Sequence, residues 1–132
     1  METPGGPTRS LSLDDYADVA PLSPGENRIG DLVLEHRPTI HHIPTTAVRV
    51  RSGARTIGYS ADTAFDPTLV AWLAECDLFF HETNLGVHTP LSSLVALPAE
   101  VRARMRLIHY PDTFDVAGSA IAVLREGDVL FV

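Results

Sequence analysis

The sequence predicts a single layered α/β domain, and three observations lead to that prediction. Short apolar segments of strand length alternate with stretches whose apolar residues recur at helical spacing. The chain has 132 residues, a length that suits one domain with a modest hydrophobic core. Apolar residues make up 45% of the chain and charged residues 20%, which are ordinary values for a globular protein.

The first part of the chain is polar and rich in proline and glycine. Residues 1–27 are therefore expected to form a loose tail and an extended segment, ahead of a structured domain over residues 28–132. The first strand candidate runs from Arg28 to Glu35 and is stopped by Pro38, because proline cannot donate a ladder hydrogen bond.

Two further strands are predicted at Ala47–Arg51 and Ala54–Tyr59. Ser52 and Gly53 between them favour a hairpin turn. The pattern then changes to helical spacing, with Asp66 as N-cap and Pro67 as the first helical residue. The apolar face of this predicted helix consists of Leu69, Val70, Leu73 and Cys76.

Two short apolar strands follow, and each runs into a histidine. Leu78–Phe80 leads into His81, and Leu107–Ile108 leads into His109. Two short helices are expected between them, at Leu91–Leu97 and Pro98–Met105, and apolar segments at 121–124 and 129–132 flank a turn at Glu126-Gly127-Asp128.

The charge balance excludes several function classes. The formal net charge is −7, and all ten basic residues are arginine, so a P-loop lysine, a Schiff-base lysine and a Ser–Lys dyad are absent. The acidic balance argues against nucleic acid as a partner of this chain alone. No run of apolar residues is long enough for a membrane helix, and one cysteine favours a cytoplasmic location.

Side chains typical of metal sites collect where the predicted strands end. Because such ends meet at one edge of a layered α/β sheet, we expect these side chains to lie close together. Imidazole nitrogens and carboxylate oxygens are the usual ligands of zinc and similar divalent metals. The candidates are His41, His42, Asp62, His81, Glu82 and His109.

Nucleophilic alternatives have less support. Cys76 is expected in the last turn of an apolar helix face, where a buried, inert thiol is the better interpretation. Ser60 lies near Asp62, but no GxSxG motif surrounds it, which argues against a serine hydrolase.

Four short motifs connect these residues to a known family. Residues 41–44 are HHIP, residues 59–63 are YSADT, residues 78–84 are LFFHETN and residues 107–110 are LIHY. In this order they resemble the C-terminal half of metallo-β-lactamase-fold hydrolases, and the ribonuclease Z-like branch in particular, over roughly residues 30 to 112. The resemblance implies the C-terminal half of a four-layer αββα fold, with a mixed sheet flanked by helices.

The same resemblance implies roles for individual residues. His41 would complete the first zinc site of a two-zinc centre, with His42 as the alternative if the alignment shifts by one. Asp62 would bridge both metals, and His109 would belong to the second site. His81 would donate a proton to the leaving oxygen with Glu82 orienting it, and His88 would contact the substrate phosphate.

The HxHxDH loop of that family, which supplies most of its metal ligands, does not occur in this sequence. The three matched ligands leave each metal with fewer protein ligands than a catalytic zinc ion requires. We therefore expect a partial zinc-dependent hydrolase of phosphoesters that is inactive alone and that needs a complementing chain or a homo-oligomer. Two alternatives stay open, a catalytically dead remnant that serves as an interaction module and a truncated reading frame.

Overall fold

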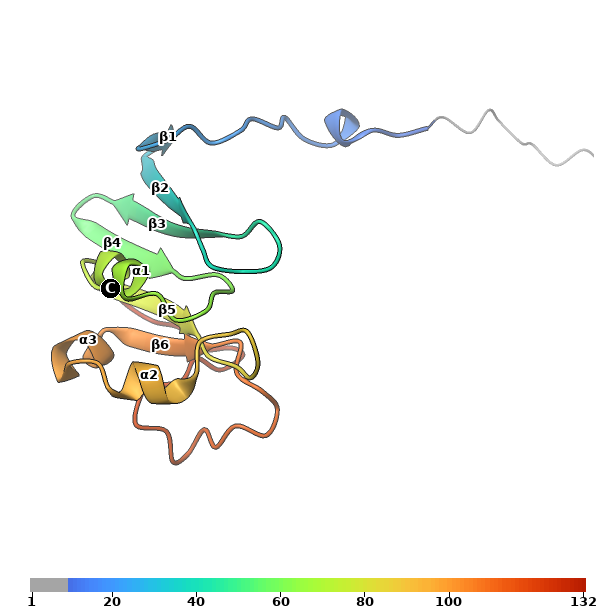
Figure 1. Cartoon of the computed structure of the whole chain (residues 1–132). Helices are drawn as coiled ribbons and strands as arrows, with labels where there is room; N and C mark the ends of the chain where they lie inside the picture. Colours follow the sequence, from blue (N-terminus) through green and yellow to red (C-terminus); the bar gives the residue numbers. More distant parts are fainter. Residues whose placement is uncertain (1–9) are drawn as a thin grey trace, which may run out of the picture.

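The computed structural model describes residues 10–132, which form one six-stranded mixed sheet with short helices (Figure 1). The strands lie side by side in sequence order, from β1 to β6. β1 to β4 pair antiparallel, whereas β4, β5 and β6 pair parallel. The predicted α/β class is confirmed. In the described part of the chain, no helix is both long and apolar enough to cross a membrane.

Residues 10–26 are exposed and contain one 3-10 turn, η1 (Leu13–Asp15). Figure 1 shows this segment leading away from the sheet. Its turn is held locally, because the backbone N–H of Ser12 donates to the Asp15 carboxylate at 2.8 Å. The earlier part of the expected tail lies outside the described residues, and the domain boundary near residue 27 stays a prediction.

The predicted strand Arg28–Glu35 is wrong in one respect, because the structure divides it into β1 (Asn27–Ile29) and β2 (Leu32–Pro38). Gly30 lies between them with φ +59°, a conformation that glycine adopts without strain and that reverses the chain. The two short strands pair with each other, with Asn27 opposite Leu34. β2 ends at Pro38, as the sequence predicts.

The predicted hairpin is confirmed. β3 (Thr46–Ser52) and β4 (Arg55–Tyr59) pair antiparallel, with Ser52 opposite Arg55. Gly53 lies in the turn with φ +57°, which explains why a glycine is found there. This hairpin leads into the parallel half of the sheet.

The connection from β4 to β5 (Leu78–Glu82) contains helix α1 (Pro67–Leu73). The helix begins as predicted, because the Asp66 carboxylate accepts the Thr68 N–H at 2.9 Å. It ends earlier than predicted, so Cys76 follows the helix and does not lie in its last turn. The Cys76 N–H bonds to the Leu73 carbonyl at 3.0 Å, a tighter spacing than an α-helix has, and this turn directs the chain into β5.

Two short helices and one strand complete the regular structure. α2 (Leu91–Val95) and α3 (Ala99–Ala103) are shorter than predicted, and β6 (Met105–Ile108) follows. The apolar segments beyond residue 120 form no described strand, and their one ladder contact is a bridge between Leu107 and Val123. The chain therefore continues beside β6 without adding a full seventh strand.

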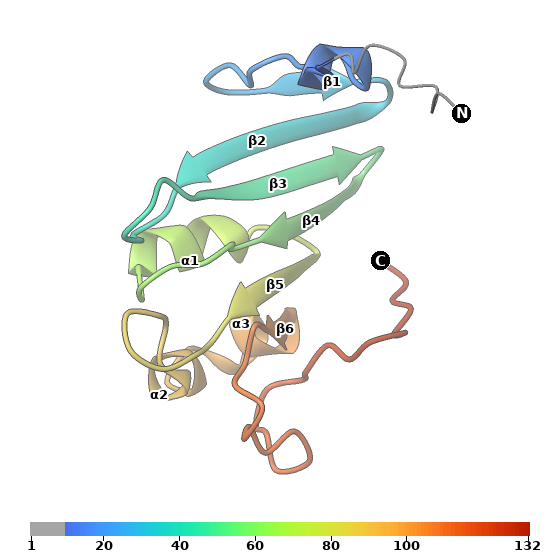
Figure 2. The same cartoon turned by 90° about the vertical axis from the view of Figure 1, so that its right-hand side faces the viewer.

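The hydrophobic core lies on one face of the sheet. Residues that stand opposite each other in paired strands lie on the same face of the sheet. Gly58 stands opposite Phe79 and Phe79 opposite Met105, so the core residues of these strands share one face. α1 and α2 cover them, as Figure 2 shows from the side. The buried core consists of Ala47, Leu69, Trp72, Leu73, Cys76, Phe79, Leu94, Met105, Leu107 and Ile121.

The opposite face of the sheet is apolar and partly exposed. Side chains alternate along each strand, so Val48, Tyr59 and Phe80 stand side by side on the face away from the helices. Ile57 and Tyr59 retain 39% and 44% exposure. We call the set Val48, Val50, Ile57, Tyr59 and Phe80 the open sheet face, since the core side chains of α1 and α2 all belong to the other face.

Candidate metal and active site

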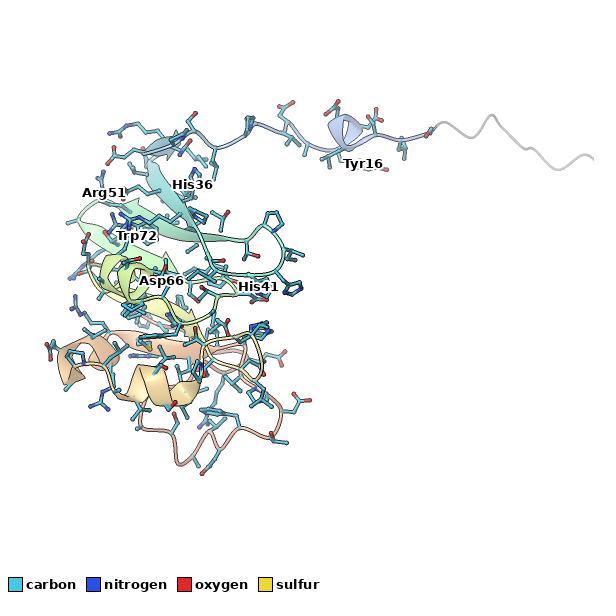
Figure 3. All side chains as sticks on the ribbon, in the orientation of Figure 1. Tyr16, His36, His41, Arg51, Asp66 and Trp72 are labelled. Atoms are coloured by element: carbon cyan, nitrogen blue, oxygen red, sulfur yellow. The ribbon has the colours of Figure 1, made fainter. Side chains whose placement is uncertain are left out.

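The predicted ligands meet at the edge of the sheet where the parallel strands end. Asp62 follows β4, and His109 follows β6. His41 comes from the loop between β2 and β3, and Figure 3 shows it at the same edge, well away from Arg51. The carboxyl ends of adjacent parallel strands are the usual place for such a site.

Asp62 lies between two imidazoles. Its Oδ1 is 3.2 Å from His109 Nδ1, and its Oδ2 is 4.0 Å from His41 Nε2. The side chain of His41 is only 4% exposed, whereas His42 is exposed and its ring centroid lies 4.2 Å from that of His41. The structure therefore brings His41, Asp62 and His109 together, and it places His41 rather than His42 beside the carboxylate.

His88 joins this group. Ligand atoms of Asp62, His88 and His109 all lie within 4.8 Å of one another. The His88 ring centroid is 5.4 Å from that of His41 and 5.1 Å from that of His109. We call His41, Asp62, His88 and His109 together the histidine cluster. They come from four separate loop segments of the chain.

Glu82 is a buried residue that contacts the histidine cluster. Its carboxylate is fully buried, and its Oε1 accepts the Thr63 N–H at 2.7 Å and the Nδ1–H of His88 at 2.9 Å. Its Oε2 lacks a hydrogen-bond partner among the described residues and lies 3.9 Å from His109 Nδ1. Glu82 thereby fixes the orientation of His88 and adds a negative charge beside the cluster.

His81 occupies a different environment. It is fully buried, and its Nδ1 bonds to the Glu82 carbonyl oxygen at 2.8 Å. It stands opposite Leu107 in the sheet and makes no described contact with the cluster residues. Burial lowers the pKa of His81 from its ordinary value, which favours the neutral ring.

Two unusual backbone conformations support the cluster. Ala61, directly before Asp62, has φ +51°, and His109 has φ +50°. Thr39 Oγ1 donates to the Asp62 carbonyl at 2.7 Å, and Asn84 Nδ2 donates to the His109 carbonyl at 2.8 Å. These contacts hold both turns in place.

The cluster has the chemistry of a divalent metal site. Imidazole nitrogens and carboxylate oxygens face one another at ligand spacing. Two buried atoms beside them, His41 Nδ1 and Glu82 Oε2, lack hydrogen-bond partners in the described chain. A positive ion between Asp62 and the imidazoles would compensate the carboxylate charges, so the residues fit a metal. They form part of a ligand set rather than a complete one.

The family resemblance implied only a contact with the substrate phosphate for His88. The spacing from Glu82 to His88 crosses a turn containing Gly86, which has φ +71°, and only the folded turn brings the two side chains together. Ser60 plays a structural part instead. Its Oγ accepts the Glu82 N–H at 3.0 Å and donates to the Ala61 carbonyl.

Comparison with known proteins identifies the family to which the sequence is similar. Residues 3–126 match the family described as Anti-Pycsar protein Apyc1. An Anti-Pycsar protein Apyc1 from Paenibacillus sp. (strain J14) is 39% identical over 132 residues, covering 89% of this chain and 53% of that protein. A cGMP-dependent 3′,5′-cGMP phosphodiesterase A from Dictyostelium discoideum is 35% identical over 107 residues, covering 67% of this chain and 12% of that protein. The chain thus spans about half or less of the length of these relatives.

Comparison with solved structures identifies proteins with a similar fold. The metallo-beta-lactamase fold protein YhfI from Bacillus subtilis has a TM-score of 0.63 at 21% identity, covering 73% of this chain and 43% of that one. The short form of human tRNase Z has a TM-score of 0.51 at 21% identity, covering 64% and 38%. These likenesses confirm the metallo-β-lactamase fold predicted from the sequence. The finer assignment to the ribonuclease Z-like branch stays a prediction, because a likeness at this identity shows the fold alone.

Proposed function

The chain belongs to the family of the Anti-Pycsar protein Apyc1, and from this premise we propose that it contributes part of the active site of a metal-dependent phosphodiesterase acting on 3′,5′-cyclic nucleotides. A phosphodiesterase-like function is supported by the fold and by the related cyclic-nucleotide phosphodiesterases of Dictyostelium discoideum. The observation that carries the proposal is the position of Asp62 between His41 and His109, with His88 beside them.

The metal in this proposal is zinc, in a two-metal centre of which this chain supplies part. His41, Asp62 and His109 would hold it, with Asp62 shared between the two positions because each of its oxygens faces a different imidazole. When bound, such ions supply a nucleophile at neutral pH and neutralise charge on the phosphate.

We assign proton donation to His88 in place of His81. Hydrolysis breaks one P–O bond of the cyclic phosphate, forms a P–O bond to the oxygen of water, and leaves a ribose oxygen that needs a proton. His88 stands in the cluster with its Nδ1–H bonded to buried Glu82, so its Nε2 is the atom left to deliver that proton. The proton that the attacking water releases replaces the one that His88 delivers. His81 Nδ1 is committed to the Glu82 carbonyl, and its unpartnered Nε2 is fully buried, so the ring has no access to a substrate oxygen.

The proposal includes a requirement for further protein. The cluster offers fewer ligands than a two-metal site needs, and the chain aligns with 53% of its Paenibacillus relative. The open sheet face is apolar and exposed, which suits a second sheet packed against it. A complementing chain, a second copy or a further part of the same protein would meet this requirement.

The experiment measures zinc content and hydrolysis for the chain alone and for the chain joined to an HxHxDH-bearing half from an Apyc1 relative. We expect weak zinc binding and near-background hydrolysis of bis-p-nitrophenyl phosphate and 3′,5′-cGMP by the chain alone. Joining the half should raise both, and Asp62→Asn should abolish the gain.

Asp31→Asn is the matched control, because Asp31 lies in the exposed β1–β2 turn and the substitution makes the same charge change away from the cluster. It should leave zinc content and rate unchanged. If the joined protein gains neither zinc nor activity, the catalytic proposal is wrong and a non-enzymatic interaction module becomes the better interpretation. Strong zinc-dependent turnover by the chain alone would disprove the requirement for a second half.

A further inference from the structure

A pocket lies directly beside the histidine cluster. It has a volume of about 290 Å³, close to the lower end of the roughly 300–1,000 Å³ typical of small-molecule sites. Its walls come from the β5–α2 loop and from the segment after β6, and His88 belongs both to its wall and to the cluster. The pocket is lined by Thr83, Asn84, Leu85, Gly86, His88, Pro90, Leu91, Pro111 and Phe114.

The polar atoms of this lining are already bonded within the chain. Asn84 Nδ2 donates to the His109 carbonyl at 2.8 Å, and Asn84 Oδ1 accepts the Leu85 N–H at 2.8 Å. Thr83 Oγ1 donates to the Thr89 carbonyl at 3.0 Å. What remains for a ligand is therefore mainly apolar surface, with His88 as the polar exception at the side of the cluster.

The apolar walls are suited to a flat ring. Phe114 is half-buried, and its ring centroid lies 5.2 Å from that of Tyr110, a neighbour that holds its orientation. Leu91 begins α2, and Leu85 is 74% exposed at the pocket mouth. A ring placed between these side chains gains contact with an aromatic ring and aliphatic groups, which is how proteins bind nucleobases without reading their edges.

We propose that this pocket, here called the base pocket, binds the nucleobase of a 3′,5′-cyclic nucleotide while its phosphate reaches the histidine cluster past His88. The inference rests on the proposed function and adds the position of the base. A cyclic nucleotide has one charged end and one flat end, joined by a single sugar ring. The chain offers a matching pair of adjoining sites, since His88 lines both.

The test compares two ligands on the whole chain in the presence of zinc. One is 3′,5′-cAMP, and the other is methyl ribofuranoside 3′,5′-cyclic phosphate, which has the same phosphate and sugar but no base. Calorimetric titration should give at least about tenfold tighter binding of cAMP, the size of one base–aromatic stacking contact. Magnetisation transfer in NMR should connect the adenine protons with the methyl groups of Leu85 and Leu91.

Variants identify the residue responsible. Phe114→Ala should weaken cAMP binding about tenfold and leave the baseless ligand unchanged. Phe114→Leu keeps an apolar side chain at this core-packing position and should give a smaller loss of the same kind. Val87→Ala is the control, because Val87 is exposed in the β5–α2 loop, which forms one wall of the pocket, but does not itself line the pocket.

The outcomes separate the two proposals. Three results would overturn the base pocket even if zinc-dependent binding of the baseless ligand persists. They are equal affinity of the two ligands, an equal effect of Phe114→Ala on both, and the absence of adenine contacts to Leu85 and Leu91. If cAMP keeps its base-dependent advantage but neither zinc nor Asp62→Asn affects either ligand, the base pocket stands and the proposed function fails. If neither ligand binds to the chain alone or to the chain joined to an HxHxDH-bearing half, both proposals are wrong.

Discussion

At the residue scale, Ala61 and His109 show that the backbone beside the histidine cluster is strained. They are the non-glycine residues with positive φ in the described chain, and such conformations cost of order 1–3 kcal/mol each. One directly precedes Asp62, and the other is itself a cluster residue. Hydrogen bonds from Thr39 and Asn84 to the neighbouring carbonyls offset part of this cost. The strain is concentrated where it brings Asp62 and His109 together.

The buried His81 makes the stability of the chain depend on pH. Burial lowers the pKa of His81 in the folded chain, whereas the unfolded chain takes up a proton near the ordinary value of about 6.5. Below that pH the unfolded chain therefore binds more protons than the folded chain. The free energy of unfolding should fall by up to about 1.4 kcal/mol for each unit by which the pH is lowered. The stability from neutral His81 is complete above about pH 6.5 and is lost as the pH decreases.

Urea unfolding of the wild type and of His81→Asn between pH 7.5 and pH 5 measures this contribution. The variant should be less stable at pH 7.5 but should show a shallower loss toward acid. His42→Asn, at an exposed position, is the control and should keep the wild-type slope. Identical slopes for His81→Asn and the wild type would contradict the prediction.

Cys76 is expected to be unreactive in the folded chain. Its side chain is fully buried, and burial raises the pKa of the thiol to about 11, so little thiolate forms near neutral pH. Labelling with a chromogenic disulfide reagent at pH 8 should be slow in buffer and fast in urea. Ala71→Cys, which adds a thiol on the exposed side of α1, should supply one rapidly labelled group. Rapid labelling of Cys76 in the folded wild type would show that the α1–β5 connection opens readily.

At the element scale, the packing of α1 on the sheet depends on close approach at Gly58. A Cβ built there would lie 2.8 Å from Leu73 Cδ2, 3.0 Å from Phe79 Cβ and 3.1 Å from Cys76 Sγ. Gly58→Ala should therefore destabilise the chain by about 1–3 kcal/mol through overpacking, although the same substitution at an open site would stabilise it. Urea unfolding at neutral pH gives the free energy.

A double variant tests this cause. Leu73→Ala removes the atom nearest to the added Cβ, so Gly58→Ala combined with Leu73→Ala should cost less than the sum of the two single variants. Additive losses would mean that the added Cβ does not act through Leu73, and would contradict the proposed contact with α1.

Arg49 links three elements on the helix-covered face. Its guanidinium lies 4.4 Å from the centroid of the Trp72 ring of α1. It also bonds to Glu35 of β2 at 2.8 Å and to Glu75 after the helix at 2.6 Å. These contacts fasten α1 to the antiparallel half of the sheet.

At the scale of the whole molecule, the buried core cluster of the described residues lies on one face of the sheet, whereas the other face keeps exposed apolar side chains. We predict that the open sheet face makes the isolated chain self-associate or bind a partner, because exposed contiguous apolar surface favours association. Sedimentation should show concentration-dependent association, and a hydrophobic dye should bind.

Ile57→Lys should reduce both signals, because it places a charge in the middle of the open sheet face. Val87→Lys is the control, at a more exposed apolar position in the β5–α2 loop outside the sheet, and should have little effect. A monodisperse monomer that binds no dye would contradict the prediction.

Much of the fold could be predicted from local patterns. The structure confirms the Ser52-Gly53 hairpin and the start of α1 at Asp66-Pro67, which each depend on neighbouring residues. It also confirms the apolar strand at Leu78–Phe80 but extends it through Glu82. The prediction that Arg28–Glu35 forms one strand was wrong, because a turn at Gly30 separates two halves that pair with each other. The extent of α2 and α3 was overestimated, because short helices are limited by packing rather than by propensity.

The sequence by itself determined the fold class and a set of candidate ligands, because strand ends and residue types are readable along the chain. The family resemblance then selected Asp62, His109 and either His41 or His42 from that set. Only the tertiary structure decided which histidine joins them, because His88 reaches the cluster through a loop and through buried Glu82, and neither contact has a sequence period. The separation of His81 from the cluster was decided in the same way. Alternation along a strand sends adjacent side chains to opposite faces, so His81 enters the core while Glu82 turns to the site.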